Sequence, residues 1–314
     1  MNFKLMNFLG VAFTLAAGAP GGAMEIQWTR MAGQWPVEAS PLVGRFTGNE
    51  EEQILVINRG GQVLLWAADG KPLGAGQDGL VCQLPTNRWT TALTPLPGGS
   101  GARFVVASVE GLVVGLDAKF QMLWQHKLAG ETSWGRGIPA LGESGLVFTD
   151  QSGTATCLKP NGEVAWTNNF GLGPCKAPAQ RFNPKAGEEA LLIPAGATLI
   201  CCAPDGRVRW RRQLDQEIVT RPEVFVAGGR EMILCGTTSG ALFALSFEGE
   251  ILWRCDTGDT FSNWIVFLPR RDDSPLILFT GLWGNLHAVD AQGRQVWTHL
   301  FRAKTRAAPL VTDT

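Results

Sequence analysis

The chain has 314 residues, with 27 Lys and Arg against 28 Asp and Glu, so its formal net charge is -1. This balance argues against a nucleic-acid-binding protein that works through bulk positive charge. Hydrophobic residues make up 45% of the chain and charged residues 18%, which is typical of a folded globular protein and excludes a disordered one. The 39 Gly and 18 Pro, without a collagen repeat, indicate many tight turns between short elements.

Residues 1–23 have the pattern of a secretory signal peptide. Lys4 precedes an apolar run over residues 8–17, and Gly21 and Ala23 provide small side chains before a cut at Met24. The apolar run has about half the length that a membrane-spanning helix needs. No Cys lies near the cut, which argues against a lipid-anchored protein. We therefore expect a secreted or periplasmic protein without a membrane span.

A repeat with a spacing of 42 to 51 residues follows. Four segments align directly, and they read GTATCLKPNGEVAW from Gly153, GATLICCAPDGRVRW from Gly196, GALFALSFEGEILW from Gly240 and GNLHAVDAQGRQVW from Gly284. Two more segments fit with one substitution each. The segment from Gly111 has Phe120 in place of the second Gly, and the segment from Gly61 has Leu73 in place of the final Trp.

Each repeat has the pattern of four short antiparallel strands. The runs are four to eight residues long, rich in Val, Ile, Leu and Phe, and bounded by turn residues. Asp-Gly at Asp69 and Asp205 and Asn-Gly at Asn161 are pairs that favour hairpin turns. No sustained helical period follows residue 24. The sequence predicts an all-β chain built from β-propeller blades, in which the recurring Trp of the fourth strand packs between neighbouring blades.

The cycle from first to fourth strand is complete six times. The chain opens with a fourth-strand element from Glu25 and closes with a first-strand element from Thr305, and both would belong to a seventh blade that lacks its middle strands. Either the sequence stops before the end of a longer protein, or its two ends form an incomplete blade. We expect one propeller domain over residues 24–314, of seven-bladed type with the terminal blade incomplete.

The repeat resembles the tryptophan-docking repeat of quinoprotein-like propellers, the pyrroloquinoline-quinone (PQQ) type. The resemblance covers nearly all of residues 24–314 and rests on Ala288, Asp290, Gly293 and Trp297, and in part on Gly111, Asp117 and Trp124. It implies a β-propeller fold. It does not imply one function, because such repeats occur both in dehydrogenases and in assembly factors.

Residues with catalytic or metal-binding patterns are scarce. The three His residues fall in separate repeats without ligand spacing, and there is no nucleophile elbow, P-loop or zinc motif. The adjacent Cys201 and Cys202 lie on an expected strand, where their side chains would face opposite sides. The seven Cys do not form a recognisable disulfide framework. We predict no catalytic residue and no metal ligand, which favours a non-enzymatic protein without deciding the question.

The segments that lead into the first strands should emerge on one face of a propeller. They carry cations in five of seven repeats and aromatic rings nearby, which together can bind an anionic or sugar-like ligand by paired hydrogen bonds and stacking. The candidate ligand-binding residues on this funnel face are Arg88, Trp89, Trp134, Arg136, Lys176, Arg221, Trp264 and Arg306. In the alternative interpretation, the cations bond local carbonyls and the Trp rings pack between blades.

These observations favour an extracytoplasmic, non-catalytic binding or assembly scaffold. Its expected partner is a protein, peptide or carbohydrate at the propeller face, with no nucleic acid, and we expect a monomer. No cofactor is predicted. One alternative is a PQQ-dependent dehydrogenase, which would need the quinone and calcium, as the family resemblance implies. Another is an outer-membrane assembly factor that binds a peptide strand at a blade edge.

Overall fold

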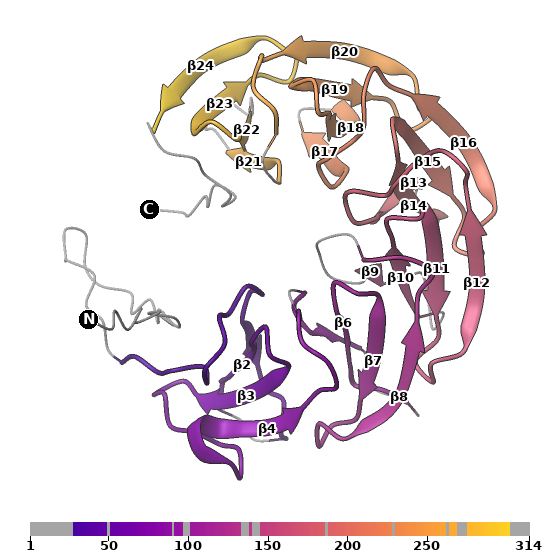
Figure 1. Ribbon diagram of the computed structural model, residues 1–314. Coiled ribbons are helices and arrows are strands. Elements are labelled where there is room, and N and C mark those ends of the chain that lie inside the picture. The colour runs from indigo at the N-terminus through magenta and orange to yellow at the C-terminus, as the bar shows by residue number, and fades with distance from the viewer. Residues whose placement is uncertain are drawn as a thin grey trace, which may run out of the picture. The chain divides into compact units, whose positions relative to one another are not determined.

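Six antiparallel sheets of four strands make up the described part of the chain (Figure 1). The structure is a computed structural model that describes residues 28–48, 51–89, 91–96, 101–132, 138–139, 145–185, 188–227, 230–261, 264–268 and 275–301. In every sheet the strands pair in chain order. The predicted all-β class and the six repeats of four strands are confirmed. The expected signal peptide and the element from Thr305 lie outside the described residues.

The described residues fall into two compact units. The first unit runs to Leu128, includes the turn at residues 160–162 and holds two sheets. Their strands are β1 (Leu42–Gly44), β2 (Gln53–Ile57), β3 (Gln62–Ala67) and β4 (Leu80–Gln83), then β5 (Thr94–Pro95), β6 (Phe104–Ala107), β7 (Leu112–Leu116) and β8 (Met122–Lys127). A 3-10 turn at Gln77–Gly79 is the one helical element within the described ranges. No helix in those ranges has the length and apolarity to cross a membrane.

The second unit holds the other four sheets. Its first two sheets contain β9 (Ile138–Pro139), β10 (Leu146–Thr149), β11 (Thr154–Leu158) and β12 (Val164–Asn169), then β13 (Gln180–Lys185), β14 (Glu188–Ala195), β15 (Thr198–Cys202) and β16 (Val208–Gln213). Its last two contain β17 (Glu223–Ala227), β18 (Arg230–Gly236), β19 (Ala241–Leu245) and β20 (Ile251–Asp256), then β21 (Val266–Leu268), β22 (Leu276–Thr280), β23 (Asn285–Val289) and β24 (Gln295–Leu300).

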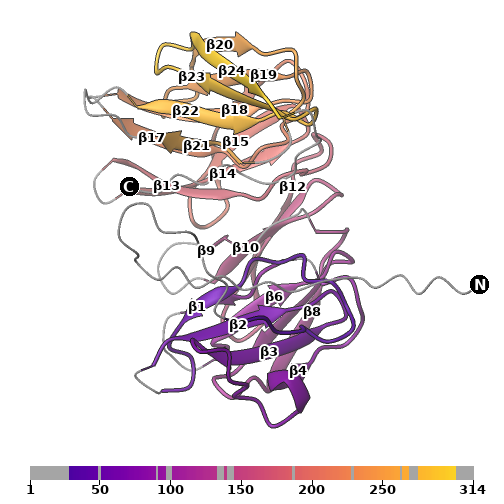
Figure 2. The ribbon, with the colours of Figure 1, turned by 90° about the vertical axis from the view of Figure 1, so that its left-hand side faces the viewer.

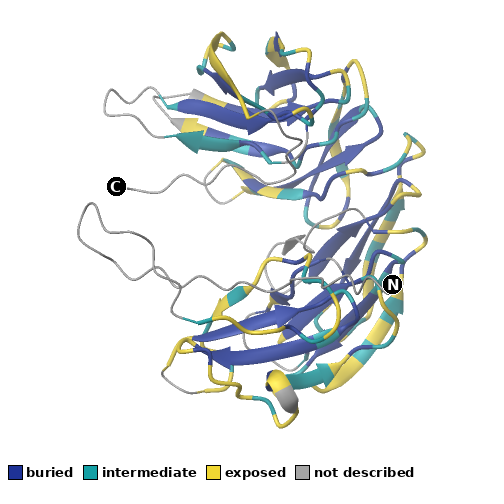
Figure 3. Ribbon diagram, turned by 60° about the vertical axis from the view of Figure 1, so that its left-hand side comes forward, coloured by how far each residue is buried: buried dark blue, intermediate teal, exposed yellow. Residues whose placement is uncertain are grey.

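The second and third strands of the sheets are largely buried, and most fourth strands are more exposed (Figure 3). Every residue of β15 and β19 is buried, whereas β12 and β16 alternate between exposed and half-buried positions. Strands such as β15 and β19 are mostly apolar along their whole length because hydrophobic clusters cover both faces of their sheets. The burial pattern therefore follows the repeat that the sequence shows.

Neighbouring sheets of the second unit share hydrophobic clusters. One cluster joins β13–β16 to β17–β20, and another joins β17–β20 to β21–β24. The last two sheets lie next to each other in Figure 1 and overlap in Figure 2. Cys201 faces the first of these clusters, while Cys202 faces the cluster shared with β9–β12. The expectation that these two side chains point to opposite sides of the strand is confirmed. None of the seven Cys forms a disulfide.

The recurring Trp of one sheet docks on the hairpin turn of the next. Each indole N–H donates a hydrogen bond to a backbone oxygen 36 to 40 residues further along the chain, at 2.8 to 3.1 Å. The donor and acceptor pairs are Trp28 and Ala68, Trp124 and Pro160, Trp166 and Pro204, Trp210 and Phe247, and Trp253 and Ala291. The predicted packing role of the recurring Trp is thereby confirmed. Each indole packs on a hairpin turn.

A turn glycine lies directly beneath each docked ring, two residues after the acceptor. Gly249 has φ +85, and a Cβ on it would lie 2.7 Å from the Trp210 ring. Gly206 has φ +83, and a Cβ there would lie 2.7 Å from Trp166. The second Gly of the repeat is thus required twice, once for the left-handed backbone and once for the close approach of the indole.

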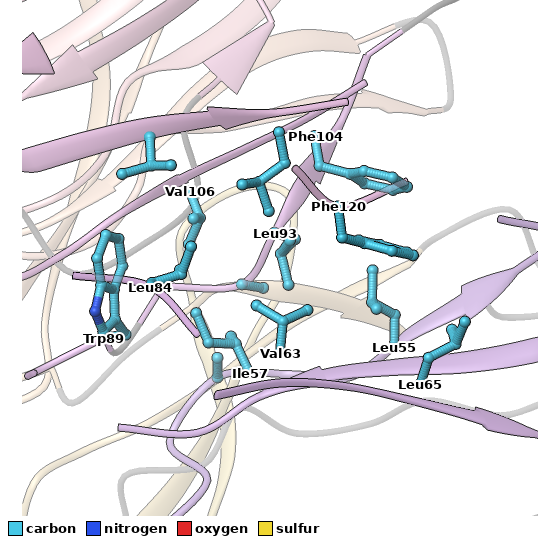
Figure 4. Close-up of a cluster of buried hydrophobic side chains, with 14 residues drawn as sticks. Leu55, Ile57, Val63, Leu65, Leu84, Trp89, Leu93, Phe104, Val106 and Phe120 are labelled. Carbon is cyan, nitrogen blue, oxygen red and sulfur yellow. The ribbon is translucent and has the colours of Figure 1, made fainter. Parts of the chain in front are cut away.

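The two irregular repeats both lie in the first unit. Leu73 N–H donates to the Leu65 carbonyl at 3.0 Å, but the chain then leaves the sheet and re-enters it only at β4, seven residues later. The expectation that Leu73 takes the place of the fourth-strand Trp is wrong, because the fourth strand is β4 (Leu80–Gln83), and this excursion explains the longer spacing. In the next turn, Phe120 has φ +61, is buried and stacks on Phe104 at 5.2 Å (Figure 4). No indole covers this turn among the described contacts, so a Phe fits where the other turns need Gly.

Candidate functional site

Two of the predicted ligand-binding residues come together in the second unit. Arg221 lies two residues before β17, and Trp264 lies two residues before β21, so they occupy the same place in neighbouring sheets. The Arg221 guanidinium carbon lies 4.3 Å from the centre of the Trp264 ring. This is a cation–π contact, in which the guanidinium also covers one face of the indole.

Glu223 completes the group, and the sequence analysis missed it. Its Oε1 accepts a hydrogen bond from Arg221 Nε at 2.8 Å and forms an ion pair with Arg221 Nη2 at 2.6 Å. The Glu223 side chain is 11% exposed, and burial raises its pKa although Arg221 acts in the opposite direction. The signal was the Arg-Pro-Glu sequence, which places an acid at the start of β17, two residues after the cation.

Arg221, Glu223 and Trp264 line an open pocket of about 450 Å³ together with Ile265, Val266 and Phe267. The apolar part comes from the entrance to β21 and from the strand itself. Because Glu223 already binds the guanidinium, the pocket offers a neutral ion pair beside apolar and aromatic surface. This differs from the anionic or sugar-like ligand expected from the sequence, for which a free cation would serve best.

The other described candidates have local partners. Lys176 forms an ion pair with Glu217 at 2.5 Å, and both side chains are more than a third exposed. Arg88 has φ +70, and its carbonyl accepts from the N–H of Val109 at 3.0 Å. Neither contact is a bond from the cation to a backbone carbonyl, so the alternative in which the cations bond local carbonyls stays untested for these two residues.

Trp89 lies in the core of the first unit and not on a surface. It is 0% exposed, and its indole N–H donates to the carbonyls of Pro85 at 3.0 Å and Thr86 at 3.3 Å (Figure 4). Its position fits the packing alternative, because a fully enclosed ring has no free face for a ligand. Trp134, Arg136 and Arg306 lie outside the described residues.

A second polar group is buried between β22–β23 and the preceding loop. The Asp259 carboxylate accepts from Asn285 Nδ2 at 2.8 Å, and its Oδ2 lies 3.6 Å from His287 Nε2. His287 Nδ1 lies 3.3 Å from the Thr298 hydroxyl, and burial lowers the His287 pKa against the opposing effect of Asp259. Gly281 leaves room for the carboxylate, which would lie 1.8 Å from a Cβ at that position. The group therefore stabilises the last sheet from inside.

Structural comparison identifies the chain as a β-propeller. It is similar to BamB from Moraxella catarrhalis, with 14% identity, a TM-score of 0.54, and coverage of 86% of this chain and 89% of that one. It is similar to Sqt1 from Saccharomyces cerevisiae, with 14% identity, a TM-score of 0.64, and coverage of 85% and 75%. It is also similar to Chaetomium thermophilum Sqt1 bound to the N-terminus of the ribosomal protein L10, with 13% identity, a TM-score of 0.61, and coverage of 87% and 77%. No family model and no curated protein sequence matches the chain.

Proposed function

We propose that the chain is a non-catalytic binding scaffold that receives a protein or peptide segment at the Arg221–Glu223–Trp264 pocket. The observation that carries this proposal is the pocket itself. A buried ion pair, a half-buried indole and three apolar residues converge at the entrance to a sheet edge. Protein interfaces are enriched in Trp, Phe and Arg, and their centres are depleted of unpaired charge.

The edge strand beside the pocket adds a second means of binding. β21 is the outermost strand of its sheet on this side, and it is only three residues long. An extended peptide can pair with such an edge through its main chain while one side chain enters the adjacent pocket. Since the pocket wall is apolar and the charge pair is neutral, we expect that side chain to be apolar or aromatic. The peptide-bound Sqt1 structure is consistent with this use of the fold.

The setting of this activity is also a proposal. We infer that the protein works outside the cytoplasm, on the pattern of residues 1–23, and that the six sheets belong to one seven-bladed propeller domain over residues 24–314. For the PQQ-dependent alternative, no three His, Cys, Asp or Glu side chains converge within the described ranges. The proposed function involves no quinone.

Selection from a displayed peptide library, followed by titration of the selected peptides against the full chain, tests the proposal. Peptides selected by the pocket should lose at least about tenfold in affinity when Trp264 is changed to Leu, since buried aromatic anchors carry much of the binding energy. Trp35→Leu is the matched control, because Trp35 is 46% exposed in the other unit. Peptides that bind equally to wild type and Trp264→Leu, or catalytic turnover that Arg221→Gln abolishes, would contradict the proposal.

A further inference from the structure

The Glu223 carboxylate uses only one of its two oxygens to bind Arg221. The hydrogen bond from Arg221 Nε at 2.8 Å and the ion pair with Nη2 at 2.6 Å both fall on Oε1. Oε2 has no hydrogen-bond partner among the described residues. Within the described part of the chain, only His287 Nε2 is a side-chain nitrogen or oxygen that is both fully enclosed and without a partner. Oε2 is therefore accessible to a ligand that carries a hydrogen-bond donor.

This oxygen belongs to a pocket whose other wall is apolar and aromatic. Glu223 lines the pocket together with Arg221, Trp264 and three apolar residues at the entrance to β21 and in the strand. One of these, Phe267, packs on the Phe225 ring at 5.1 Å, and Phe225 is 2% exposed. The wall is thus backed by the core of the second unit. The pocket combines this wall with one carboxylate acceptor.

The ion pair selects against a charged occupant. A Lys or Arg side chain that reached Oε2 would add a second cation beside the Arg221 guanidinium, which already binds the same carboxylate. A carboxylate or phosphate would meet the negative charge of Glu223, which Arg221 balances only once. The occupant that fits this arrangement is neutral and brings one donor.

Among neutral side chains, Tyr matches the pocket best. Ser and Thr carry a hydroxyl but no apolar body that could cover the wall. Asn and Gln would place further polar atoms against apolar side chains, where those atoms find no partner. Tyr has a flat apolar ring and a single hydroxyl at its far end, so the ring can pack on the wall while the hydroxyl reaches the acceptor.

We propose that the pocket selects a Tyr side chain of its partner, and that the phenol O–H donates a hydrogen bond to Glu223 Oε2. This inference rests on the proposed function and narrows its occupant from an apolar or aromatic side chain to one residue type. Glu223 is then the residue that determines specificity, and Trp264 contributes apolar contact. The 314 residues contain no Tyr, so a second copy of them does not provide the occupant.

A displayed peptide library and one exchange of residue test the proposal with the full chain. Peptides are selected on wild type, and those that lose affinity for Trp264→Leu are kept. We expect these peptides to share a Tyr at one position. Changing this Tyr to Phe should weaken binding to wild type by at least about tenfold, because a hydrogen bond to a charged acceptor is stronger than one between neutral groups. This comparison needs no variant at Glu223.

The variant Glu223→Gln then links the preference to its residue. When the amide oxygen accepts from Arg221, an NH2 group takes the place of Oε2, and the phenol finds no acceptor. The Tyr and Phe peptides should therefore bind Glu223→Gln within about threefold of each other, which makes a double-mutant cycle. Glu250→Gln is the matched control and should keep the full preference, because Glu250 is exposed beside β20, at the other edge of the same sheet.

The outcomes separate this inference from the proposed function. If Trp264-dependent peptides carry Phe or Leu at the shared position, or if wild type binds the Tyr and Phe peptides equally, the inference is overturned and the proposed function stands. An undiminished Tyr preference in Glu223→Gln also overturns it. If no selected peptide depends on Trp264, the proposed function fails and this inference fails with it.

Discussion

Replacing Gly249 by Ala measures what the docking of one indole contributes to stability. Gly249 has φ +85, so an Ala is strained there by about 1 kcal/mol before any contact is considered. Its Cβ would also lie 2.7 Å from the Trp210 ring, closer than two carbon atoms can approach. The indole must then move away from the turn. The substitution therefore combines a backbone cost with the loss of the docked ring.

The free-energy cost of displacing the ring follows from the hydrogen bonds that Trp210 and Arg212 make with the turn. Moving these two side chains breaks the hydrogen bond from Trp210 to Phe247, 3.0 Å, and the bond from Arg212 to Gly249, 2.5 Å. Each bond contributes about 1 kcal/mol net, so Gly249→Ala should lower the free energy of unfolding by about 3 kcal/mol. Gly258 is the matched control in the same sheet. It has φ +69 and no atom within 4 Å of its Cβ position, so Gly258→Ala should cost only about 1 kcal/mol.

Urea unfolding of the three proteins, followed by circular dichroism, gives both free energies. The difference between the two Ala variants isolates the docked ring from the backbone strain, and it should be about 2 kcal/mol. Equal losses for Gly249→Ala and Gly258→Ala would refute the reasoning, because they would show that the indole contributes nothing beyond the left-handed turn.

Three further predictions concern buried groups. Phe120→Gly restores the turn residue of the repeat but removes a buried ring stacked on Phe104, so thermal or urea unfolding should show a net loss of about 2 kcal/mol or more, and a gain would contradict this account. Burial lowers the pKa of His287, so the unfolded chain takes up its proton first, and stability should fall as the pH drops below about 6.5; His287→Phe should remove this part of the pH dependence of the urea midpoint. Burial raises the pKa of Cys201 to about 11 and of Cys202 to about 12, so a thiol reagent at pH 8 should label them only after unfolding, and rapid labelling of the native protein would count against the burial of β15.

Much of the fold follows from the repeat, because period and residue type together determine local structure. Apolar runs bounded by Gly and Asp predict the strands, and the Asp-Gly and Asn-Gly pairs predict the turns. The excursion of the chain between Leu73 and β4 was not predictable. Leu73 still forms a backbone hydrogen bond to Leu65 of β3, and the chain leaves the sheet only after it. The hairpin turn on which each indole packs was not predictable either. It lies about 40 residues away in sequence, and only the packing of neighbouring sheets brings it close.

The candidate site was predicted only in part. The position before each first strand correctly brings Arg221 to Trp264, because the strands of neighbouring sheets begin at the same level. Trp89 lies in a segment that leads into a first strand, where the sequence predicts a ring at the propeller face, yet it is fully buried. Composition and spacing do not distinguish an indole that packs in the core from one at a rim. Glu223 was overlooked although the Arg-Pro-Glu sequence places it two residues after Arg221, because only the structure shows that the two side chains form an ion pair.

Hydrogen exchange of the indole N–H groups, followed by NMR in the isolated protein, tests most directly whether the recurring Trp residues are docked on hairpin turns. The indoles of Trp28, Trp124, Trp166, Trp210 and Trp253 donate to turn carbonyls and should exchange slowly. Trp297, which lacks an acceptor among the described residues, should exchange quickly. Fast exchange of the five docked indoles, or protection of Trp297 equal to theirs, would contradict the account.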